Sequence, residues 1–407
     1  MLYLSRYPFS TLKNLPTGSD NRGTGLLTQA GYVRRELAGA YSYLHMGKRV
    51  LDRITQIVRE EMNAIDGTEI VMPSLGSKEH WMTTNRWNEI DVLFKLPASE
   101  GGEPREYALN PTHEEIVTPL MKEFIQSYKD LDSCAVYQFQ TKFRNEKRAK
   151  SGVLRGREFI MKDLYSFHTS QESLDVYFER VREAYVRVFE RLGIGAITHY
   201  AFASGGDFSK YSYEFQTELG IGEDVVYVCD ACGQAHNTEI VEASGFKCVS
   251  CGATAYHETT VSETGNIFKL GTRFSNAFGL SYTDAQGKMQ DVYMGCYGIG
   301  ISRLMGVIAE RLADDKGLVW PEAIAPYTHY IIAFPETIEE ATVLARKIEA
   351  EGGSVLIDDR AQGFGHKAGD ADLLGIPHRI VVSKKTLENG GYEYKSRTSD
   401  AVEIRVL

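Results

Sequence analysis

The sequence predicts an α+β fold that combines helices with antiparallel strands, followed by a separate small α/β domain. Apolar residues recur at helical spacing in three segments, and short runs of aromatic and β-branched residues between them are typical of antiparallel strands. After Trp320-Pro321 the pattern alternates between helix and strand, which favours the second domain. A length of 407 residues is consistent with two or three domains.

The first helix is expected over residues 32–62, where apolar side chains recur every three or four residues apart from one interval of seven. It should end near Asp66-Gly67. Residues 69–72 then have the composition of a short strand. Pro73 should stop this strand because proline cannot donate a ladder hydrogen bond.

Two further helices are expected, over residues 113–125 and 174–192. Thr112 followed by Glu115 matches a capping box at the start of the first, and Gly193 follows the apolar stripe of the second. Between these helices, antiparallel strands are expected within residues 135–168. In the C-terminal domain, the expected order is helix, strand, helix and strand, over residues 336–350, 354–357, 366–373 and 379–382.

Composition and charge limit the class of protein. Hydrophobic residues make up 43% of the chain and charged residues 25%, the balance of an ordinary globular protein. No apolar run approaches the ~18 residues of a membrane span, and no secretory or organellar leader is recognisable, so we expect a cytoplasmic protein without membrane contact. The net charge of −10 argues against non-specific coating of nucleic acid but is compatible with local basic patches that meet RNA.

Four of the six cysteines form two Cys-x-x-Cys pairs within residues 225–260. Six cysteines are too few for a disulfide scaffold, and paired spacing of this kind is typical of a metal site in a reducing compartment. We expect a structural zinc knuckle whose ligands are the thiolates of Cys229, Cys232, Cys248 and Cys251. The alternative is a set of reduced free thiols. His236 and His257 lie nearby and are expected to be bystanders.

The stretch from Lys142 to His168 has eight Lys or Arg against three acidic residues, a local charge of +5 in an acidic protein. A solvated charged hairpin is the simpler interpretation. A nucleotide site is the alternative, because guanidinium groups fit phosphate oxygens and an aromatic ring stacks on a base. Strand spacing favours the alternative by placing the following residues on shared faces: Arg144 with Glu146, and Arg155 with Arg157 and Phe159.

These residues resemble motif 2 of the class II aminoacyl-tRNA synthetases, in which Phe-Arg-x-Glu (here residues 143–146) precedes a loop and a second Arg-bearing strand. Residues 293–303, a glycine-rich passage that ends in Arg303, resemble motif 3. Met72-Pro73 matches the weaker motif 1, a dimer-interface element. The resemblance implies the family's antiparallel sheet flanked by helices.

Further segments resemble the bacterial-type prolyl-tRNA synthetases: residues 110–115, 161–168, 268–272 and 295–298. This resemblance implies a catalytic domain over residues 1–324 and an anticodon-binding domain over 325–407. It also implies a homodimer that makes prolyl-adenylate and pyrophosphate from proline and ATP, and transfers proline to the 3'-terminal adenosine of tRNA(Pro). The other interpretations are a class II synthetase for threonine or serine, and a non-catalytic paralogue that binds tRNA.

The resemblance also implies roles at an ATP site. Arg144 and Arg303 would be the catalytic residues, Arg144 on the α-phosphate and the proline carboxylate, and Arg303 on the γ-phosphate. Glu146 would accept from the adenine amino group, while Phe159 would stack on the ring. Mg²⁺ would bridge phosphate oxygens. Further ATP contacts are expected from Arg155, Arg157, Lys269 and Thr272.

At the proline site, Thr112 and Glu114 match the family's Thr-x-Glu element, which receives the amino group of proline. A carboxylate that faces this ammonium makes chemical sense, because either charge buried alone would be costly. A helix cap is the alternative role for Thr112, and a packed aromatic core is the alternative for the other lining residues. Besides Arg144, the expected lining is Met161, Asp163, Tyr165, His168 and Cys296; adenylation requires no cysteine nucleophile.

Two departures from the family stand out, and the absence of an editing domain is expected. Bacterial-type relatives usually carry a large editing insertion where, in this chain, only fifteen residues separate Cys232 from Cys248. An apolar pocket rejects a smaller amino acid by only ~1–3 kcal/mol, so mischarged alanine would not be corrected by this chain. Lys269 replaces a Gln found in some relatives, and Tyr213 stands where His is common.

Overall fold

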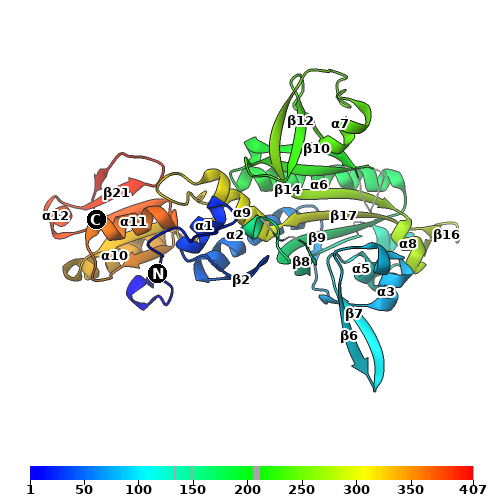
Figure 1. Cartoon of the computed structure of the whole chain (residues 1–407), viewed down its shortest axis with the longest axis horizontal. Coiled ribbons are helices and arrows are strands. Elements are labelled where there is room, and N and C mark those ends of the chain that lie inside the picture. The colour runs from blue at the N-terminus through cyan, green and yellow to red at the C-terminus, as the bar shows by residue number, and fades with distance from the viewer. Residues whose placement is uncertain (133, 148, 150, 205–210, 407) are drawn as a thin grey trace. The chain divides into compact units, whose positions relative to one another are not determined.

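The computed structural model describes residues 1–132, 134–147, 149, 151–204 and 211–406 (Figure 1). The chain divides into two compact units, one of Met1–Leu37, Tyr41–Ile54 and Met305–Leu407, and one of Ala38–Ala40 and Thr55–Leu304. The expected domain boundary at residue 324 stays a prediction. Strand β1 (Leu2–Tyr3) pairs in parallel with β19 (Val355–Asp358), which joins the start of the chain to the C-terminal sheet.

The unit that contains Thr55–Leu304 is built on a sheet whose described strands run in the order β11-β10-β13-β12-β14-β17-β9-β8-β4. Neighbouring strands are antiparallel except in the pairs β4–β8 and β10–β13. The antiparallel strands predicted within residues 135–168 are confirmed as β8 and β9. The bounds are β4 (Thr68–Glu69), β8 (Cys134–Phe143), β9 (Glu158–His168), β10 (Thr198–Ser204), β11 (Tyr211–Glu218), β12 (Asp224–Cys229), β13 (Ala235–Asn237), β14 (Tyr256–Gly271) and β17 (Tyr293–Gly300).

Helix α6 (Gln171–Arg191) lies along one face of this sheet, and it confirms the helix predicted over residues 174–192 (Figure 1). The Ser170 side chain caps its start by accepting from the Ser173 N–H (3.2 Å). The predicted apolar stripe is the buried face, which packs on β9, β14 and β17 through Leu174, Tyr177, Phe178, Val181, Tyr185 and Val188.

The opposite face of the sheet packs against α5 (Glu114–Lys122) and α8 (Arg273–Phe278). The shared core includes Val117, Met121, Tyr165, Phe167, Phe268, Phe274 and Met294. The predicted capping box at the start of α5 is wrong. His113 occupies the N-cap position, and the Glu115 carboxylate instead accepts hydrogen bonds from Thr84 and Arg86, at 2.8 Å each.

The long helix predicted over residues 32–62 is confirmed only in its second part, as α2 (His45–Asn63). The first part forms β2 (Val33–Leu37) and β3 (Ala40–Tyr43), which pair with each other. Gly39 turns the chain between them with φ of +80°, a conformation that few residues other than glycine adopt. The helical spacing of apolar residues was misleading here: Leu37, one of the residues that define the spacing, is 55% exposed and packs in no helical core. The following strand, β4, ends at Glu69 and so is shorter than predicted.

The C-terminal region confirms the predicted alternation of helix and strand. Its sheet has the order β1-β19-β18-β20-β21-β22, in which β18, β19 and β20 are parallel and β21 and β22 antiparallel. The bounds are β18 (His329–Ala333), α10 (Ile338–Ala350), α11 (Phe364–Leu374), β20 (His378–Val382), β21 (Tyr392–Ser396) and β22 (Glu403–Arg405). Among the helices that the structure describes, none has the length and apolar character of a membrane span.

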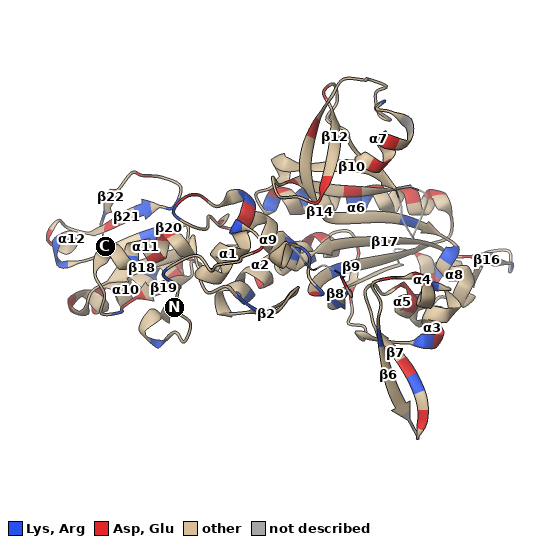
Figure 2. Ribbon diagram, viewed as in Figure 1, with Lys and Arg blue, Asp and Glu red and all other residues tan. Residues whose placement is uncertain are grey.

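A smaller sheet, β5-β7-β6, precedes α5 in the chain. Its elements are β5 (Leu75–Ser77), α3 (Lys78–Thr83), α4 (Arg86–Glu89), β6 (Phe94–Glu100) and β7 (Glu103–Leu109). In Figure 2 the ribbon of β7 is coloured for two acidic residues, Glu103 and Glu106, and for one basic residue, Arg105. Trp81, Trp87 and Ala108 form a local core, and Arg86 is buried beside α5.

Candidate active site

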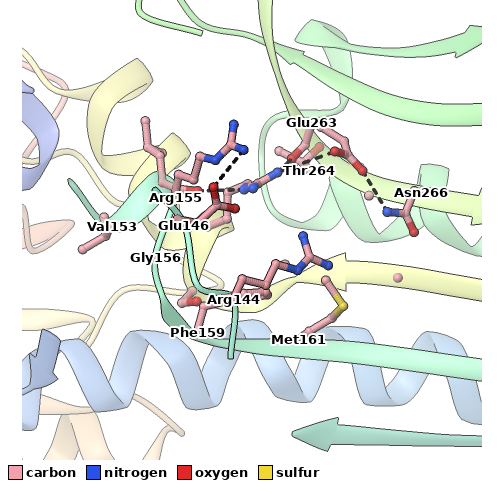
Figure 3. A pocket seen from close by; sticks show the side chains of 16 residues that line it. Arg144, Glu146, Val153, Arg155, Gly156, Phe159, Met161, Glu263, Thr264 and Asn266 are labelled. Atoms are coloured by element: carbon pink, nitrogen blue, oxygen red, sulfur yellow. Dashed lines mark hydrogen bonds and ion pairs between the residues drawn. The ribbon is translucent and has the colours of Figure 1, made fainter. Parts of the chain in front are cut away.

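A pocket of about 510 Å³ lies where β8 ends and β9 begins (Figure 3). Its walls come from the β8–β9 connection, from β14, and from the junction of β17 with α9 (Ile301–Leu312). The motifs that the sequence separates by about 130 residues therefore meet in one site. Among the residues predicted for the site, those lining this pocket are Arg144, Glu146, Arg155, Phe159, Met161 and Arg303.

Arg144 directs its guanidinium into the pocket from the position that follows β8 (Figure 3). Its backbone N–H donates to the Arg157 carbonyl (2.8 Å), which fixes the base of the side chain. The guanidinium carbon lies 5.1 Å from the centre of the Phe159 ring, and no hydrogen bond or ion pair with the described residues engages the group. Burial, and then the nearby Arg303, lower the pKa of Arg144, yet a guanidinium keeps its proton at neutral pH. A cation with unused donors thus faces the pocket.

Arg303 supplies a second guanidinium to the same pocket. Its Nε donates to the Leu154 carbonyl (2.8 Å) and its Nη1 to the Glu263 carbonyl (2.5 Å). Ser302 ties the start of α9 to β9, because its hydroxyl accepts from the Ile160 N–H (3.1 Å). Two fixed cations in one pocket suit a ligand with several anionic oxygens, such as a polyphosphate.

Glu146 and Arg155 form an ion pair at the pocket, with 3.1 Å between Oε2 and Nη2. Arg155 also pairs with Glu223 at 2.7 Å. A second hollow of about 660 Å³ shares these side chains and adds Asp224 and Glu263 to its lining. The two hollows are therefore lined by both guanidinium groups and carboxylates.

Arg157 does not line either hollow. Its guanidinium donates to the backbone carbonyls of Glu146 (2.9 and 3.1 Å) and Ala38 (3.0 Å). These bonds fix the connection between β8 and β9, so the side chain acts on the shape of the loop that carries Glu146.

A buried polar cluster continues from the pocket along β9 and β17. Alternate residues of a strand share a face, so Met161 in the pocket is followed by Asp163 and Tyr165. The Glu114 carboxylate is at the centre of the cluster and is fully buried. It accepts from the Thr112 hydroxyl (2.5 Å) and from the Cys296 thiol (3.1 Å). Burial, with the nearby Glu114 carboxylate, raises the pKa of Cys296 well above its usual value, so this cysteine is a thiol.

Asp163 lies in the same cluster but is paired within the protein. Lys142, which is fully buried, approaches Asp163 Oδ1 to 2.8 Å, and Gln138 Nε2 donates to Oδ2 at 3.0 Å. Lys142 Nζ also contacts His113 Nδ1, and burial lowers the pKa of His113 to about 4, which keeps that imidazole neutral. Burial lowers the pKa of Lys142, and the nearby Asp163 carboxylate opposes this shift.

Three further predicted site residues lie outside both the pocket and the buried polar cluster. His168 packs against Tyr177 of α6 and contacts the hydroxyls of Ser166 (2.8 Å) and Ser173 (3.2 Å). Lys269 pairs with Asp175 of α6 (2.7 Å). Strand alternation accounts for both, because His168 and Lys269 point to the face opposite Tyr165 and Phe268. Thr272 is the N-cap residue of α8 and accepts from Asn276 (3.2 Å).

Sequence reasoning missed two charged residues of the polar cluster, Lys142 and Arg86. Lys142 carried a usable signal, because it lies two residues before Arg144 on the same predicted strand. Arg86 carried none. Its contact with Glu115 joins positions 29 residues apart, which no local pattern specifies.

The cysteine motif forms a compact cluster. The Sγ atoms of Cys229, Cys232, Cys248 and Cys251 all lie within 4.8 Å of one another. Cys229 and Cys251 are 3.6 Å apart, and Cys232 and Cys248 are 3.5 Å apart. These separations are close to the ~3.8 Å edge of a tetrahedron with zinc–sulfur bonds of ~2.3 Å. The residues therefore fit a tetrahedral thiolate-bound metal.

Comparison with protein families finds two matches. The model for the class II core domain of tRNA synthetases (G, H, P, S and T) matches residues 94–312, which contain both the pocket and the cysteine cluster. The model for an anticodon-binding domain matches residues 328–406, which cover the C-terminal α/β region.

Whole-chain comparison finds similarity to proline–tRNA ligases of Geobacillus sp. (strain WCH70) and Bacillus subtilis (strain 168). Each is 32% identical, with 97% of this chain covered and 96% and 97% of theirs. The alignment with the Geobacillus protein spans 552 positions, more than the 407 residues of this chain, so that relative has residues without a counterpart here. In fold, the chain is similar to the Giardia lamblia prolyl-tRNA synthetase in complex with prolyl-adenylate (TM-score 0.77, 20% identity, 94% of this chain and 73% of that chain).

Proposed function

The chain belongs to the proline–tRNA ligases, a family of class II tRNA synthetases, and on that basis we propose that it activates proline with ATP and transfers it to tRNA(Pro). It is an aminoacyl-tRNA synthetase, whose first step yields prolyl-adenylate and pyrophosphate and whose second esterifies the 3'-terminal adenosine of the tRNA. The observation that carries the proposal is the convergence of Arg144, Phe159 and Arg303 on one pocket.

In the first step a proline carboxylate oxygen attacks the α-phosphorus of ATP, and pyrophosphate leaves. Arg144, whose donors are unused, neutralises the charge on the α-phosphate and orients the proline carboxylate. Arg303 holds the γ-phosphate and so stabilises the leaving group. No covalent enzyme nucleophile is needed, because positioning and charge neutralisation supply most of the rate in such phosphoryl chemistry.

The adenine ring is assigned to Phe159 and Glu146. Phe159 offers an aromatic face within the pocket, and Glu146 pairs with Arg155 through Oε2, which leaves Oε1 for the adenine amino group. Arg155 would add a phosphate contact, whereas Arg157 supports the site through the loop backbone. His168, Lys269 and Thr272 lie outside the pocket and are omitted from the proposed contacts.

Mg²⁺ would add neutralising charge when bound with the triphosphate. Asp224 and Glu263, whose carboxylates line the adjoining hollow, are the residues that would hold the ion, because oxygen is the ligand that Mg²⁺ prefers. Glu263 Oε2 lies 3.9 Å from Arg303 Nη1, which places it near the proposed γ-phosphate.

The amino group of proline is assigned to Glu114, with Thr112 and Cys296 as neighbours that already hydrogen-bond the carboxylate. Tyr165 and Met161 supply the apolar walls for the pyrrolidine ring. Asp163 acts indirectly, through its pair with Lys142.

For the remaining partners, we propose a structural Zn²⁺ on the four cysteines, tRNA(Pro) bound through the C-terminal domain, and a cytoplasmic homodimer. The thiolate geometry supports the zinc, and the anticodon-domain match supports the tRNA. The fifteen residues between Cys232 and Cys248, together with the unmatched residues of the longer relative, support the absence of editing of alanyl-tRNA by this protein.

The deciding experiment is amino-acid-dependent exchange of labelled pyrophosphate into ATP by the purified protein. We expect proline to stimulate exchange, and threonine and serine to leave it at background. Arg144→Lys, which keeps a positive charge but loses the planar fork, should reduce proline-dependent exchange by ~100-fold or more. Stimulation by threonine or serine would instead indicate a synthetase for that amino acid. Background exchange with every amino acid alongside retained tRNA binding would indicate a non-catalytic paralogue.

A further inference from the structure

Glu223 is a carboxylate of the active site to which none of the assigned roles applies. It lines the second hollow together with Arg155, and its Oε2 lies 2.7 Å from Arg155 Nη1. Glu146 Oε2 lies 3.1 Å from Nη2, the other terminal nitrogen of the same guanidinium (Figure 3). Both terminal nitrogens of Arg155 therefore already contact carboxylates.

The two carboxylates differ in their freedom to move. The Glu146 side chain is 12% exposed, whereas the side chains of Glu223 and Arg155 are 40% and 43% exposed. The backbone that carries Glu223 packs closely on β14, since a Cβ at Gly222 would lie 2.0 Å from the Val261 carbonyl oxygen. The Glu223 carboxylate can thus turn toward solvent while the backbone beside it stays in place.

Glu223 also contacts the connection between β8 and β9 at a second point. The Ser151 hydroxyl donates to Glu223 Oε1 (3.4 Å), so one carboxylate holds both Ser151 and Arg155. Ser151 has a φ of +73°, a left-handed conformation that costs free energy for residues other than glycine. The contacts of Glu223 help to hold the connection in this conformation.

A phosphate group and a carboxylate bind a guanidinium in the same way, through hydrogen bonds from its N–H groups. The phosphate contact proposed for Arg155 therefore needs donors that Glu223 occupies. The charge of Glu223 would also repel a phosphate placed beside it. Glu146 is less exposed and is assigned to adenine, so Glu223 is the carboxylate that has to yield to the polyphosphate.

We propose that Glu223 competes with the polyphosphate for Arg155: the carboxylate binds the guanidinium before ATP enters, yields to ATP, and returns as pyrophosphate leaves. The inference rests on the proposed function, since it takes ATP as the ligand of Arg155. The competition lowers the affinity for ATP and for pyrophosphate alike, because both displace the same carboxylate. Release of the product is thereby favoured at a small cost in ATP binding.

The test measures pyrophosphate exchange by the full-length protein with Glu223→Gln, which keeps the size of the side chain but removes its charge. KM for ATP and KM for pyrophosphate should each fall ~2- to 5-fold, the range that one partly exposed ion pair supports. KM for proline should not change, because Arg155 is not assigned to proline. Equilibrium dialysis with Mg·ATP in the absence of proline should show the same gain in ATP affinity. Both gains should shrink in high salt, which screens the exposed pair in wild type.

Two comparisons separate competition from other effects. Asp91→Asn breaks the exposed pair of Asp91 with Lys147 (3.2 Å), which restrains the same connection although neither residue lines the two hollows. This control should leave every KM at the wild-type value. Arg155→Ala should raise KM for ATP, and R155A/E223Q should have the same KM as Arg155→Ala, because no guanidinium remains to compete for.

Three results would overturn the inference. A rise in KM for ATP in Glu223→Gln, with a greater requirement for Mg²⁺, would make Glu223 a ligand of the metal. An unchanged KM for ATP would show that the ion pair does not compete with the nucleotide. An equal decrease in the Arg155→Ala background would show that Glu223 acts by repulsion alone. Failure of the proposed function is distinct, because wild type itself would then show no proline-dependent exchange.

Discussion

The guanidinium of Arg144 lies over the ring of Phe159, with 5.1 Å between the guanidinium carbon and the ring centre. The contact joins the residue after β8 to the second residue of β9, across the connection that Arg157 holds in place. A cation–π contact of this kind contributes ~0.5–2 kcal/mol and, more importantly here, restricts a side chain that has no other partner among the described residues. The ring thus orients the cation, in addition to its proposed role as a stacking face for adenine.

Replacing Phe159 should therefore weaken ATP use more than proline use. Base stacking on an aromatic side chain contributes ~1–3 kcal/mol, so Phe159→Leu should lower kcat/KM for ATP by ~10- to 100-fold in the exchange assay. Phe159→Tyr keeps the ring and should stay within about threefold of wild type. Wild-type kcat/KM for ATP in Phe159→Leu would show that adenine does not stack there.

Glu114 should control proline affinity through its charge. Glu114→Gln keeps the size of the side chain but presents a neutral amide to the ammonium, which removes one partner of a buried pair at a cost of ~2–5 kcal/mol. We expect KM for proline to rise by ~30-fold or more and KM for ATP to change little. Glu123→Gln, at the exposed C-terminal end of α5, is the control. An ATP defect without a proline defect would contradict the assignment.

The lining of the pocket was partly predictable from sequence. Strand alternation predicted a shared face for Arg155, Arg157 and Phe159; Arg155 and Phe159 line the pocket, whereas Arg157 precedes β9 and donates to backbone carbonyls. Arg303 follows a strand-to-helix passage with its own glycine pattern. For each of these residues, the neighbours that matter lie within about twenty positions along the chain or within the same motif.

The failures share a different cause, which is contact between distant parts of the chain. Lys269 and His168 face α6 rather than the pocket, and only the register of the assembled sheet decides which face each strand presents. Glu115 had the spacing of a capping residue. Its carboxylate instead accepts hydrogen bonds from Arg86 and Thr84, which belong to another helix–loop segment. Local propensity cannot report such tertiary partners.

Loss of the proposed zinc should destabilise the unit that contains the cysteines. We expect about one zinc per chain by elemental analysis of protein purified without chelator. Cys248→Ser should lose the metal and lower Tm by ~5–10 °C, because metal binding stabilises only the folded state. Cys134→Ser, outside the cluster, should keep both the metal and Tm. Well under one zinc per chain, with no effect of Cys248→Ser on Tm, would indicate free thiols.

Absence of an editing domain should be visible with a mischarged substrate. Incubation of alanyl-tRNA(Pro) with the enzyme should release alanine no faster than incubation with heat-denatured enzyme, and alkaline hydrolysis gives the full signal. Because an apolar pocket discriminates by only ~1–3 kcal/mol, alanine should also stimulate weak pyrophosphate exchange. Rapid enzyme-dependent release of alanine would show that an editing site exists elsewhere in this chain.

Glu214 should make stability depend on pH in the neutral range. It lies on β11, where Oε2 accepts from Gln216 (2.7 Å) and Asn237 (3.2 Å), and burial together with the nearby Glu263 raises its pKa to about 8. The unfolded chain releases this proton near pH 4.3. Between those values the folded state binds more protons than the unfolded state, so the free energy of unfolding falls as pH rises through this window.

Glu214→Gln removes this titrating group and keeps the shape of the side chain. The free energy of unfolding of the variant should therefore lack the part of the pH dependence that comes from Glu214. Relative to wild type, the variant should gain stability between pH 5 and pH 8.5 in urea unfolding followed by far-UV circular dichroism. Glu258→Gln, on the exposed start of β14, should show the wild-type slope. If Glu214→Gln and wild type lose stability in parallel over this range, the Glu214 carboxyl is already ionised in the folded protein, and its environment is more polar than its hydrogen bonds to two amide groups indicate.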